Sequence, residues 1–191
     1  MTPEEPRRLE VDALKALAHP LRVRIFSELS TFGPSTASAL GERLGESSGA
    51  TSYHLRQLEK HGFVREDCER GNARDRWWER VPGPVEFASD GGVARDAENL
   101  VEMEFARLED QRFTDYWLQR EGLGEDWVRA AQASSANLLL SAAELDELGD
   151  EVLAVLQRYR DRPDDGSRRR VEVVFRGFPV KRSAPPQTDR D

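Results

Sequence analysis

The chain has 191 residues, of which 38% are hydrophobic, and this is enough for one or two small cores. No apolar run approaches the length of a membrane span, and the start, MTPEEPRRLE, is too polar for a secretory signal. We therefore expect a cytoplasmic protein without a membrane partner. The single cysteine, Cys68, excludes an internal disulfide framework and cannot form a thiolate metal cluster alone.

The net charge of −8 is unevenly distributed along the chain. Residues 1–84 hold 13 basic and 13 acidic residues, whereas residues 85–163 hold 8 basic and 18 acidic ones. Local patches, rather than the total charge, decide association with a charged partner. The acidic middle of the chain therefore does not exclude nucleic-acid binding by the neutral first part.

Two helices are predicted in the first third of the chain, after a start at residues 1–8 that is expected to be disordered. The first runs from Leu9 to Ala18, with leucines on one side. The second begins at Pro20, because the missing N–H of proline costs nothing in the first turn of a helix. Gly33 and the proline after it end this second helix.

Two more short helices follow, and a tight turn joins them. Ser35 or Thr36 can cap the first of these helices, and Gly45 is placed to end it. Ser47 can cap the next helix, which is expected to stop at Gly62 in the left-handed conformation. Its first two turns hold small hydroxyl residues, and leucines follow behind. A helix that enters the DNA major groove by its N-terminus requires this arrangement, with an apolar rear face for packing.

A β-hairpin is predicted directly after these helices. Phe63–Cys68 and Arg76–Val81 have the pattern of strands, and Gly71–Asn72 between them is typical of a turn. Basic residues surround this turn, namely Arg70, Arg74 and Arg76. Together with the preceding helices, the hairpin predicts a winged helix-turn-helix domain over residues 9–84.

The second half of the chain is predicted as a long helix followed by a smaller unit. The helix spans about residues 93–120. Further on, Asn137–Leu140 is a short apolar run, and Ser141 with Glu144 forms a capping-box pattern at the start of another helix. RRRVEVVFRGFPV, residues 168–180, has the pattern of a strand.

The expected fold class is therefore mainly α with small β, namely the winged helix-turn-helix followed by a helical dimerisation region and a small strand–helix–strand unit. Residues 93–180 form this second region, and residues 183–191 are expected to be a disordered tail. The two strands of the small unit could pair with each other or with a partner chain. The long helix, together with the first helix, is expected to form a homodimer.

Three blocks in order, LKALAHPLRVRIFSEL, TASALGERLG and SSGATSYHLRQLEKHGFV, resemble the ArsR-like winged-helix transcriptional regulators. The resemblance is closest to the metal-independent actinobacterial branch and covers residues 9–82. It implies a bacterial regulator, with repression as the expected sign, that binds double-stranded DNA as a dimer. Two recognition helices would enter successive major grooves of a pseudo-palindromic operator, about 34 Å apart.

The resemblance also implies which residues meet DNA. The first two turns of the recognition helix would face bases, through Ser48, Gly49, Ser52 and Tyr53. Phosphates would be met by Thr36, Thr51, Arg56 and Gln57. The wing would reach the DNA backbone or minor groove through Arg70, Arg74 and Arg76.

The chain departs from the metal-sensing members of the family. Residues 36–45 contain neither cysteine nor histidine, and residues 93–162 contain no histidine. Because a zinc site needs about four ligands, no metal and no cofactor are expected. An effector, whether a small molecule or a protein, stays open.

Two function classes remain at this point. The first is the DNA-binding regulator, and the alternative is a winged-helix module for protein–protein interaction without specific DNA binding. The wing arginines and the hydroxyl-rich helix start favour DNA, since a protein-only module needs neither. No nucleophile–base pair and no phosphate-binding loop is present in the sequence, so an enzyme is not expected.

Overall fold

The structure of the chain is a computed structural model, and it divides into two compact units, Met1–Ala130 and Ala131–Asp191. This division differs from the predicted boundary, because the long helix that starts at residue 93 belongs to the first unit. The described residues are 7–8, 11–70, 76–83, 85–86, 93–163 and 166–181.

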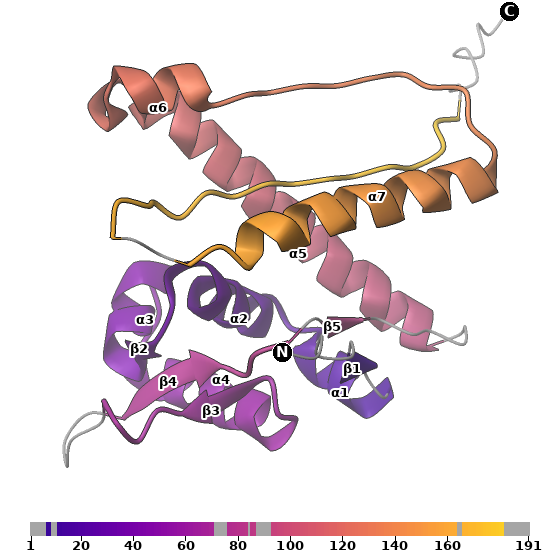
Figure 1. Ribbon diagram of the computed structural model, residues 1–191. Helices are drawn as coiled ribbons and strands as arrows, with labels where there is room; N and C mark the ends of the chain where they lie inside the picture. Colours follow the sequence, from indigo (N-terminus) through magenta and orange to yellow (C-terminus); the bar gives the residue numbers. More distant parts are fainter. Residues whose placement is uncertain are drawn as a thin grey trace, which may run out of the picture. The chain divides into compact units, whose positions relative to one another are not determined.

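The first unit is mainly helical, with helices close to the predicted ranges (Figure 1). Pro20 is the first residue of its helix, and both Gly45 and Gly62 adopt positive φ, at 70° and 68°, as predicted. The helices are α1 (Val11–Leu17), α2 (Pro20–Phe32), α3 (Ala37–Leu44), α4 (Ser48–Lys60), α5 (Val93–Gln119), the 3-10 helix η1 (Arg120–Leu123) and α6 (Glu125–Ala130).

The predicted hairpin is present as part of a three-stranded sheet. Strands β3 (Val64–Glu66) and β4 (Trp77–Arg80) pair antiparallel, with Arg65 opposite Glu79. A short strand that the sequence analysis did not predict, β2 (Ser35–Thr36), pairs with the other edge of β4. The strand order is therefore β2-β4-β3.

A second small sheet brings the start of the chain beside the residues that follow the wing. Strand β1 (Arg7–Arg8) pairs in parallel with β5 (Val85–Glu86). The expectation that residues 1–8 are disordered is therefore wrong at Arg7 and Arg8. Residues 1–6 and the predicted tail at residues 183–191 lie outside the described part of the chain.

The core of the first unit is shared between the helix-turn-helix and α5. Buried side chains come from all four short helices and from the sheet, and Ala97 and Val101 of α5 are buried in the same cluster. The rings of Phe26 and Phe105 meet edge to face at 6.2 Å. A hydrogen bond of 3.1 Å from Arg112 Nη1 to Ser27 Oγ links α5 to α2. Helix α5 is thus required to complete this core.

The second unit consists of one helix between two extended segments. Helix α7 (Ala142–Arg160) begins with the predicted capping box, in which the Ser141 N–H donates to Glu144 Oε2 at 2.7 Å and the Glu144 N–H donates to Ser141 Oγ at 3.3 Å. The extended segments, residues 131–141 and 166–181, run in the same direction and opposite to α7 (Figure 1).

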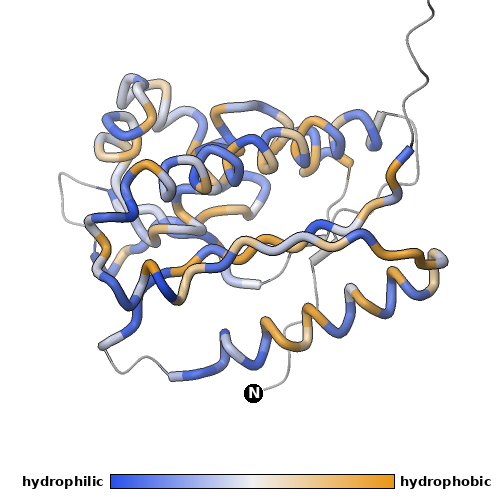
Figure 2. Tube along the Cα trace, turned by 90° about the horizontal axis from the view of Figure 1, so that it is seen from above, coloured by the Kyte–Doolittle hydropathy of each residue, from blue (hydrophilic) through white to orange (hydrophobic). Residues whose placement is uncertain are grey.

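The predicted strands of this unit are extended, but within the described residues neither of them joins a sheet. Apolar stretches recur along both segments and along α7 (Figure 2). None of the described residues of this unit is buried. Across both units, no helix in the described part of the chain has the length and apolar character to cross a membrane.

Candidate nucleic-acid interface

Side-chain caps fix the two helices of the helix-turn-helix. The Ala39 N–H donates to Thr36 Oγ1 at 3.2 Å, so Thr36 caps α3. The Ala50 N–H donates to Ser47 Oγ at 3.2 Å, so Ser47 caps α4. These hydrogen bonds satisfy backbone donors that a helix start leaves unpaired. The first turn of α4 therefore has a defined position relative to α3.

Thr51 lies on the face of α4 that packs against α3, together with Leu55 and Leu58. All three residues have a relative exposure of 0%. The Thr51 hydroxyl donates to the carbonyl oxygen of Ser47 at 3.0 Å. The prediction that Thr51 meets a phosphate is therefore wrong, because the side chain is buried and its hydroxyl is already used.

A continuous exposed stripe lies on the opposite side of α4. Gly49, Tyr53, Arg56 and Lys60 are exposed, and their spacing of four, three and four residues places them on one side of a helix. The Tyr53 side chain is 56% exposed. Sequence analysis did not predict Lys60, although the same spacing would have identified it.

The other predicted residues of α4 flank this stripe. Ser48 is exposed at the helix start, and Ser52 and Gln57 are half-buried beside the stripe. The hydroxyl and amide groups of these three residues therefore border the exposed side chains. Of the residues on α4 that were predicted to contact DNA, only Thr51 is buried.

Ion pairs and hydrogen bonds from α2 hold the helix-turn-helix in place. Arg24 Nη2 donates to the carbonyl oxygen of Leu44 at 2.7 Å, and Arg24 Nη1 lies 3.8 Å from Glu46 Oε1. Arg43 pairs with Glu28 at 2.9 Å, between Nε and Oε2. The turn between α3 and α4 is thus fixed to the rest of the unit.

Two histidine rings support the rear of α4. The centroids of His19 and His54 are 4.5 Å apart, and His19 Nδ1 accepts a hydrogen bond from the Leu21 N–H at 3.2 Å. Burial lowers the pKa of both imidazoles, and the nearby Arg22 guanidinium lowers them further. Neutral rings are therefore favoured at this contact between α2 and α4.

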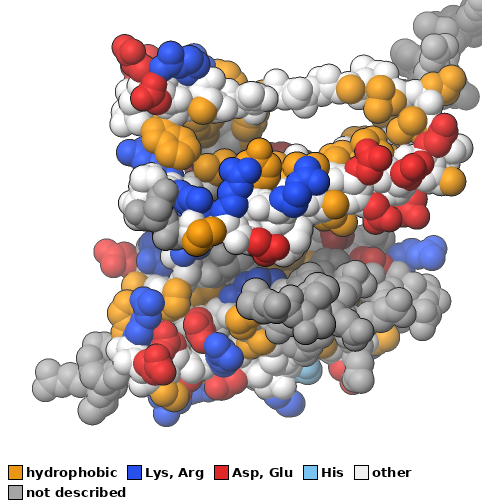
Figure 3. Space-filling view, viewed as in Figure 1, with side chains coloured by type: hydrophobic (Ala, Val, Ile, Leu, Met, Phe, Trp, Pro, Cys, Tyr) orange, Lys and Arg blue, Asp and Glu red, His pale blue; other side chains and the backbone are white. Residues whose placement is uncertain are grey.

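The wing presents arginines that already have acidic neighbours. Arg70 Nε lies 3.2 Å from Asp67 Oδ2, and Arg76 Nη1 lies 3.7 Å from Glu66 Oε2. Both arginine side chains are exposed. The third predicted wing residue, Arg74, lies outside the described residues. Figure 3 shows basic and acidic side chains close together around the hairpin.

The described residues do not bring together three or more histidine, cysteine, aspartate or glutamate side chains that could hold a metal ion. The side chain of Cys68 is exposed. The exposed and half-buried side chains of α4 carry hydroxyl, phenol, amide, guanidinium and ammonium groups. Such groups form hydrogen bonds and can contact phosphates, and the hydroxyls of Ser47 and Ser48 lie at the N-terminus of the helix.

The packed helices α1 to α4 and the hairpin β3–β4 define a winged helix-turn-helix fold, as predicted. The sequence comparison agrees, since a sequence model described as a helix-turn-helix domain matches residues 17–67. No curated protein matches the chain.

Several solved structures are similar to parts of the chain. HlyU from Vibrio cholerae N16961 is 27% identical, over 47% of this chain and 85% of that chain, with a TM-score of 0.32. The transcriptional repressor BigR from Xylella fastidiosa is 21% identical, over 50% of this chain and 83% of that chain, with a TM-score of 0.33.

Proposed function

We propose that this protein is a sequence-specific DNA-binding transcriptional regulator that binds a pseudo-palindromic operator as a homodimer, with repression as the expected sign. The observation that carries the proposal is the exposed stripe of α4, which begins at a capped helix N-terminus. The small, hydroxyl and basic residues of this stripe are exposed on the side of α4 opposite the core of the described unit. The stripe has the chemistry of a recognition helix.

The positions of the residues along α4 suggest which of them contact bases and which contact phosphates. Ser48, Gly49 and Ser52 are small, so the helix backbone can approach base edges and phosphates closely. Tyr53 presents a phenol and an aromatic face to the groove. The helix N-terminus adds free N–H groups that favour phosphate.

Basic residues farther along the same helix fit a backbone-contacting role. Arg56 and Lys60 continue the stripe beyond the first two turns and would meet phosphates. Gln57, at the border of the stripe, would add a hydrogen bond. In this proposal the wing contributes Arg74, together with Arg70 and Arg76 after they exchange their carboxylate partners for phosphates.

Exposed apolar side chains of α5 support the homodimer. Ala97 and Val101 face the core, whereas Leu100 and Met103 are 60% and 70% exposed. Trp117, farther along the helix, is also exposed. Large apolar side chains that a helix leaves exposed often lie in a protein interface, so α5 would pack against its counterpart in a second copy.

The proposal is tested by fluorescence-anisotropy binding to the duplex upstream of the protein's own coding sequence, with a scrambled duplex as the control. Measurements at about 50 and 200 mM salt give the number of phosphate contacts. A specific regulator should prefer its operator by about a thousandfold. Weak and equal binding to both duplexes would contradict the proposal for this operator, and genome-wide binding would then decide whether another exists.

One observation favours a second candidate, a winged-helix module that binds proteins. The described wing arginines, Arg70 and Arg76, are both paired with carboxylates, so the wing offers less free positive charge than its sequence suggests. A protein module would leave DNA binding weak, non-specific and unchanged by substitutions on α4. The substitution of Tyr53 by alanine therefore separates the two candidates.

A further inference from the structure

Arg22, in the first turn of α2, is a cation without an acidic partner in the described chain. It forms no ion pair there, and its Nε atom is buried without a hydrogen-bond partner. The first turn of α2 contains no acidic residue either. By contrast, Arg24 of the same helix lies near Glu46, and Arg43 pairs with Glu28. A guanidinium that is partly removed from water without a partner costs free energy, and an anion would offset this cost.

The Arg22 guanidinium interacts electrostatically with two side chains of α4. Burial lowers the pKa of Arg22, and Tyr53 raises it. Burial also lowers the pKa of His54, and the charges of His19 and Arg22 lower it further. Burial and the Arg22 charge lower the pKa of His19 as well. Neutral imidazoles are therefore favoured, and the positive charge of this group lies on Arg22.

Ring contacts join this group to the exposed stripe of α4. The ring centroids of His19 and His54 are 4.5 Å apart, and the rings of His54 and Tyr53 meet edge to face at 5.2 Å. Tyr53 belongs to the stripe, and its side chain is 56% exposed. Because Arg22 interacts with all three rings, its guanidinium lies on the flank of the stripe, beside the proposed DNA-binding surface.

The carboxylate that acts on this group is already engaged by another arginine. Glu46, in the turn between α3 and α4, raises the pKa of His54, and its Oε1 atom lies 3.8 Å from Arg24 Nη1. Arg24 therefore offsets the charge of Glu46. His54 Nδ1 is buried without a hydrogen-bond partner, as Arg22 Nε is. The group thus keeps one uncompensated positive charge and two nitrogen atoms without partners.

We propose that Arg22 and Tyr53, backed by His54, form a site for one phosphate group on the flank of α4. The guanidinium would pair with two phosphate oxygens, since its planar fork matches phosphate, and the Tyr53 hydroxyl would donate a hydrogen bond to a third. The neutral His54 ring would position both side chains without competing for the anion. The phosphate is supplied by a DNA backbone or by a free phosphate ion. The inference rests on the proposed function, because it places a further backbone contact beside the recognition helix.

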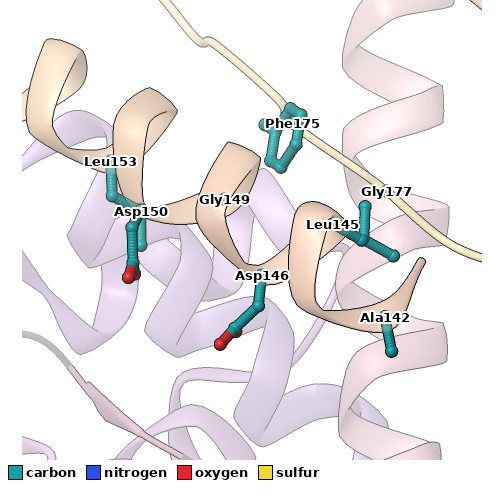
Figure 4. Close-up of a pocket in the computed structure, with 8 residues that line it drawn as sticks. All are labelled: Ala142, Leu145, Asp146, Gly149, Asp150, Leu153, Phe175 and Gly177. Carbon is teal, nitrogen blue, oxygen red and sulfur yellow. The ribbon is translucent and has the colours of Figure 1, made fainter. Parts of the chain in front are cut away.

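A hollow in the C-terminal unit has the opposite charge. Helix α7 and the last segment enclose it, with a volume of about 350 Å³ (Figure 4). Asp146 and Asp150 line it, beside apolar side chains such as Leu145 and Phe175. Carboxylates repel phosphate. Resonances from this hollow, such as the amide of Gly149, therefore serve as an internal reference when phosphate is added.

The first measurement is a titration of the full chain with inorganic phosphate, followed by NMR at constant ionic strength. The Nε–H resonance of Arg22 and the ring resonances of His54 should shift together and saturate in the millimolar range. The amide resonance of Gly149 should not move. Arg22→Gln should abolish saturation at His54, whereas Lys15→Gln, which removes an exposed charge from α1, should retain it.

The second measurement gives the salt dependence of DNA binding for the same variants. Arg22→Gln should reduce the slope of log affinity against log salt by about one, because one phosphate contact is lost, and Lys15→Gln should not change it. Urea unfolding supplies a readout for a merely structural role. Arg22→Gln should keep the free energy of unfolding, since no ion pair in the described chain is lost. Lower stability of this variant with normal phosphate saturation and a normal slope would overturn the proposal.

The outcomes separate the two sources of phosphate. A reduced slope, with or without saturation by free phosphate, assigns the site to the DNA backbone. Saturation with an unchanged slope assigns it to a free phosphate ion. No saturation and an unchanged slope would overturn the site, even in a protein that binds its operator specifically. Saturation at Arg22 in a protein that binds all duplexes weakly and equally would retain the site and contradict the regulator.

Discussion

Gly41 of α3 lies directly against Thr51 of α4. A β-carbon at Gly41 would be 3.2 Å from Thr51 Oγ1 and 2.8 Å from the carbonyl oxygen of Glu46. The second distance is shorter than real β-carbon contacts, and its partner is backbone that cannot move aside cheaply. The absent side chain of Gly41 therefore sets the separation of the two helices and the position of the turn between them.

Gly41→Ala is expected to destabilise the protein. Alanine gains about 1 kcal/mol over glycine in a helix interior, but overpacking costs about 1–3 kcal/mol, and the backbone contact makes the second effect larger. Urea unfolding measures the difference in the free energy of unfolding. Gly49→Ala is the control, since its nearest neighbouring atom is 4.0 Å away. Equal stability of the two variants would show that the helices are not in close contact.

Thr51→Val is expected to lower the free energy of unfolding by about 1 kcal/mol, because it removes the hydrogen bond to the Ser47 carbonyl and keeps the volume. The salt dependence of DNA binding should not change, because the side chain is buried. Anisotropy titrations of folded protein measure this. A reduced slope would restore the prediction that Thr51 meets a phosphate.

Arg56→Ala and Lys60→Ala are each expected to weaken DNA binding with little effect on stability. The slope of log affinity against log salt should fall by about one for each variant, because each removes one phosphate contact. Arg129→Ala, an exposed arginine of α6, is the matched control and should leave the slope unchanged. If Lys60→Ala has the same salt slope as the unsubstituted protein, Lys60 does not contact a phosphate and the DNA interface ends within the first three turns of α4.

The double variant Arg74→Ala with Arg76→Ala tests the wing. Arg76 is 65% exposed, and an exposed ion pair such as the one it forms with Glu66 contributes about 0–1 kcal/mol, so the protein should remain folded. DNA affinity should fall, and the salt slope should decrease by about one or two. An unchanged slope would exclude the wing from the interface.

Stability is expected to decrease on acidification through His19 and His54. Burial lowers the pKa of both imidazoles from the ordinary 6.5, so below that pH the unfolded chain binds protons that the folded chain does not. The contribution of the two neutral imidazoles to the free energy of unfolding is present above pH 6.5, and it is lost as the pH falls through their lowered pKa values in the folded protein. Urea unfolding at several pH values measures this loss. His54→Gln should reduce the pH dependence, and an unchanged dependence would contradict the assignment.

Local rules predicted much of the first unit. The cap at Ser47, the proline at the start of α2 and the left-handed Gly45 each follow from the chemistry of one or two residues. Strand β2 has only two residues and no period, so its pairing with β4 could not be predicted. The burial of Thr51 could not be predicted from the sequence either. A hydroxyl group in a helix can donate its hydrogen bond to the backbone carbonyl four residues earlier, so it can be buried without a partner elsewhere.

The C-terminal unit shows a different limit. The strand predicted over residues 168–180 is extended chain that joins no sheet within the described residues, because a strand period does not reveal which segment supplies the partner. The capping box at Ser141 and Glu144 was predicted because both partners are local. Pairing between separated segments depends on contacts that no short stretch of sequence contains.

The hydrogen bond between Ser27 and Arg112 joins residues 85 positions apart, and Ala97 and Val101 fill the same core as the first helices. During synthesis, the helix-turn-helix therefore emerges from the ribosome before the residues that complete its core. Until α5 follows, the apolar sides of α1 and α2 are open to chaperones and proteases. A fragment that ends after the wing should fold poorly, although it contains every residue proposed to meet DNA.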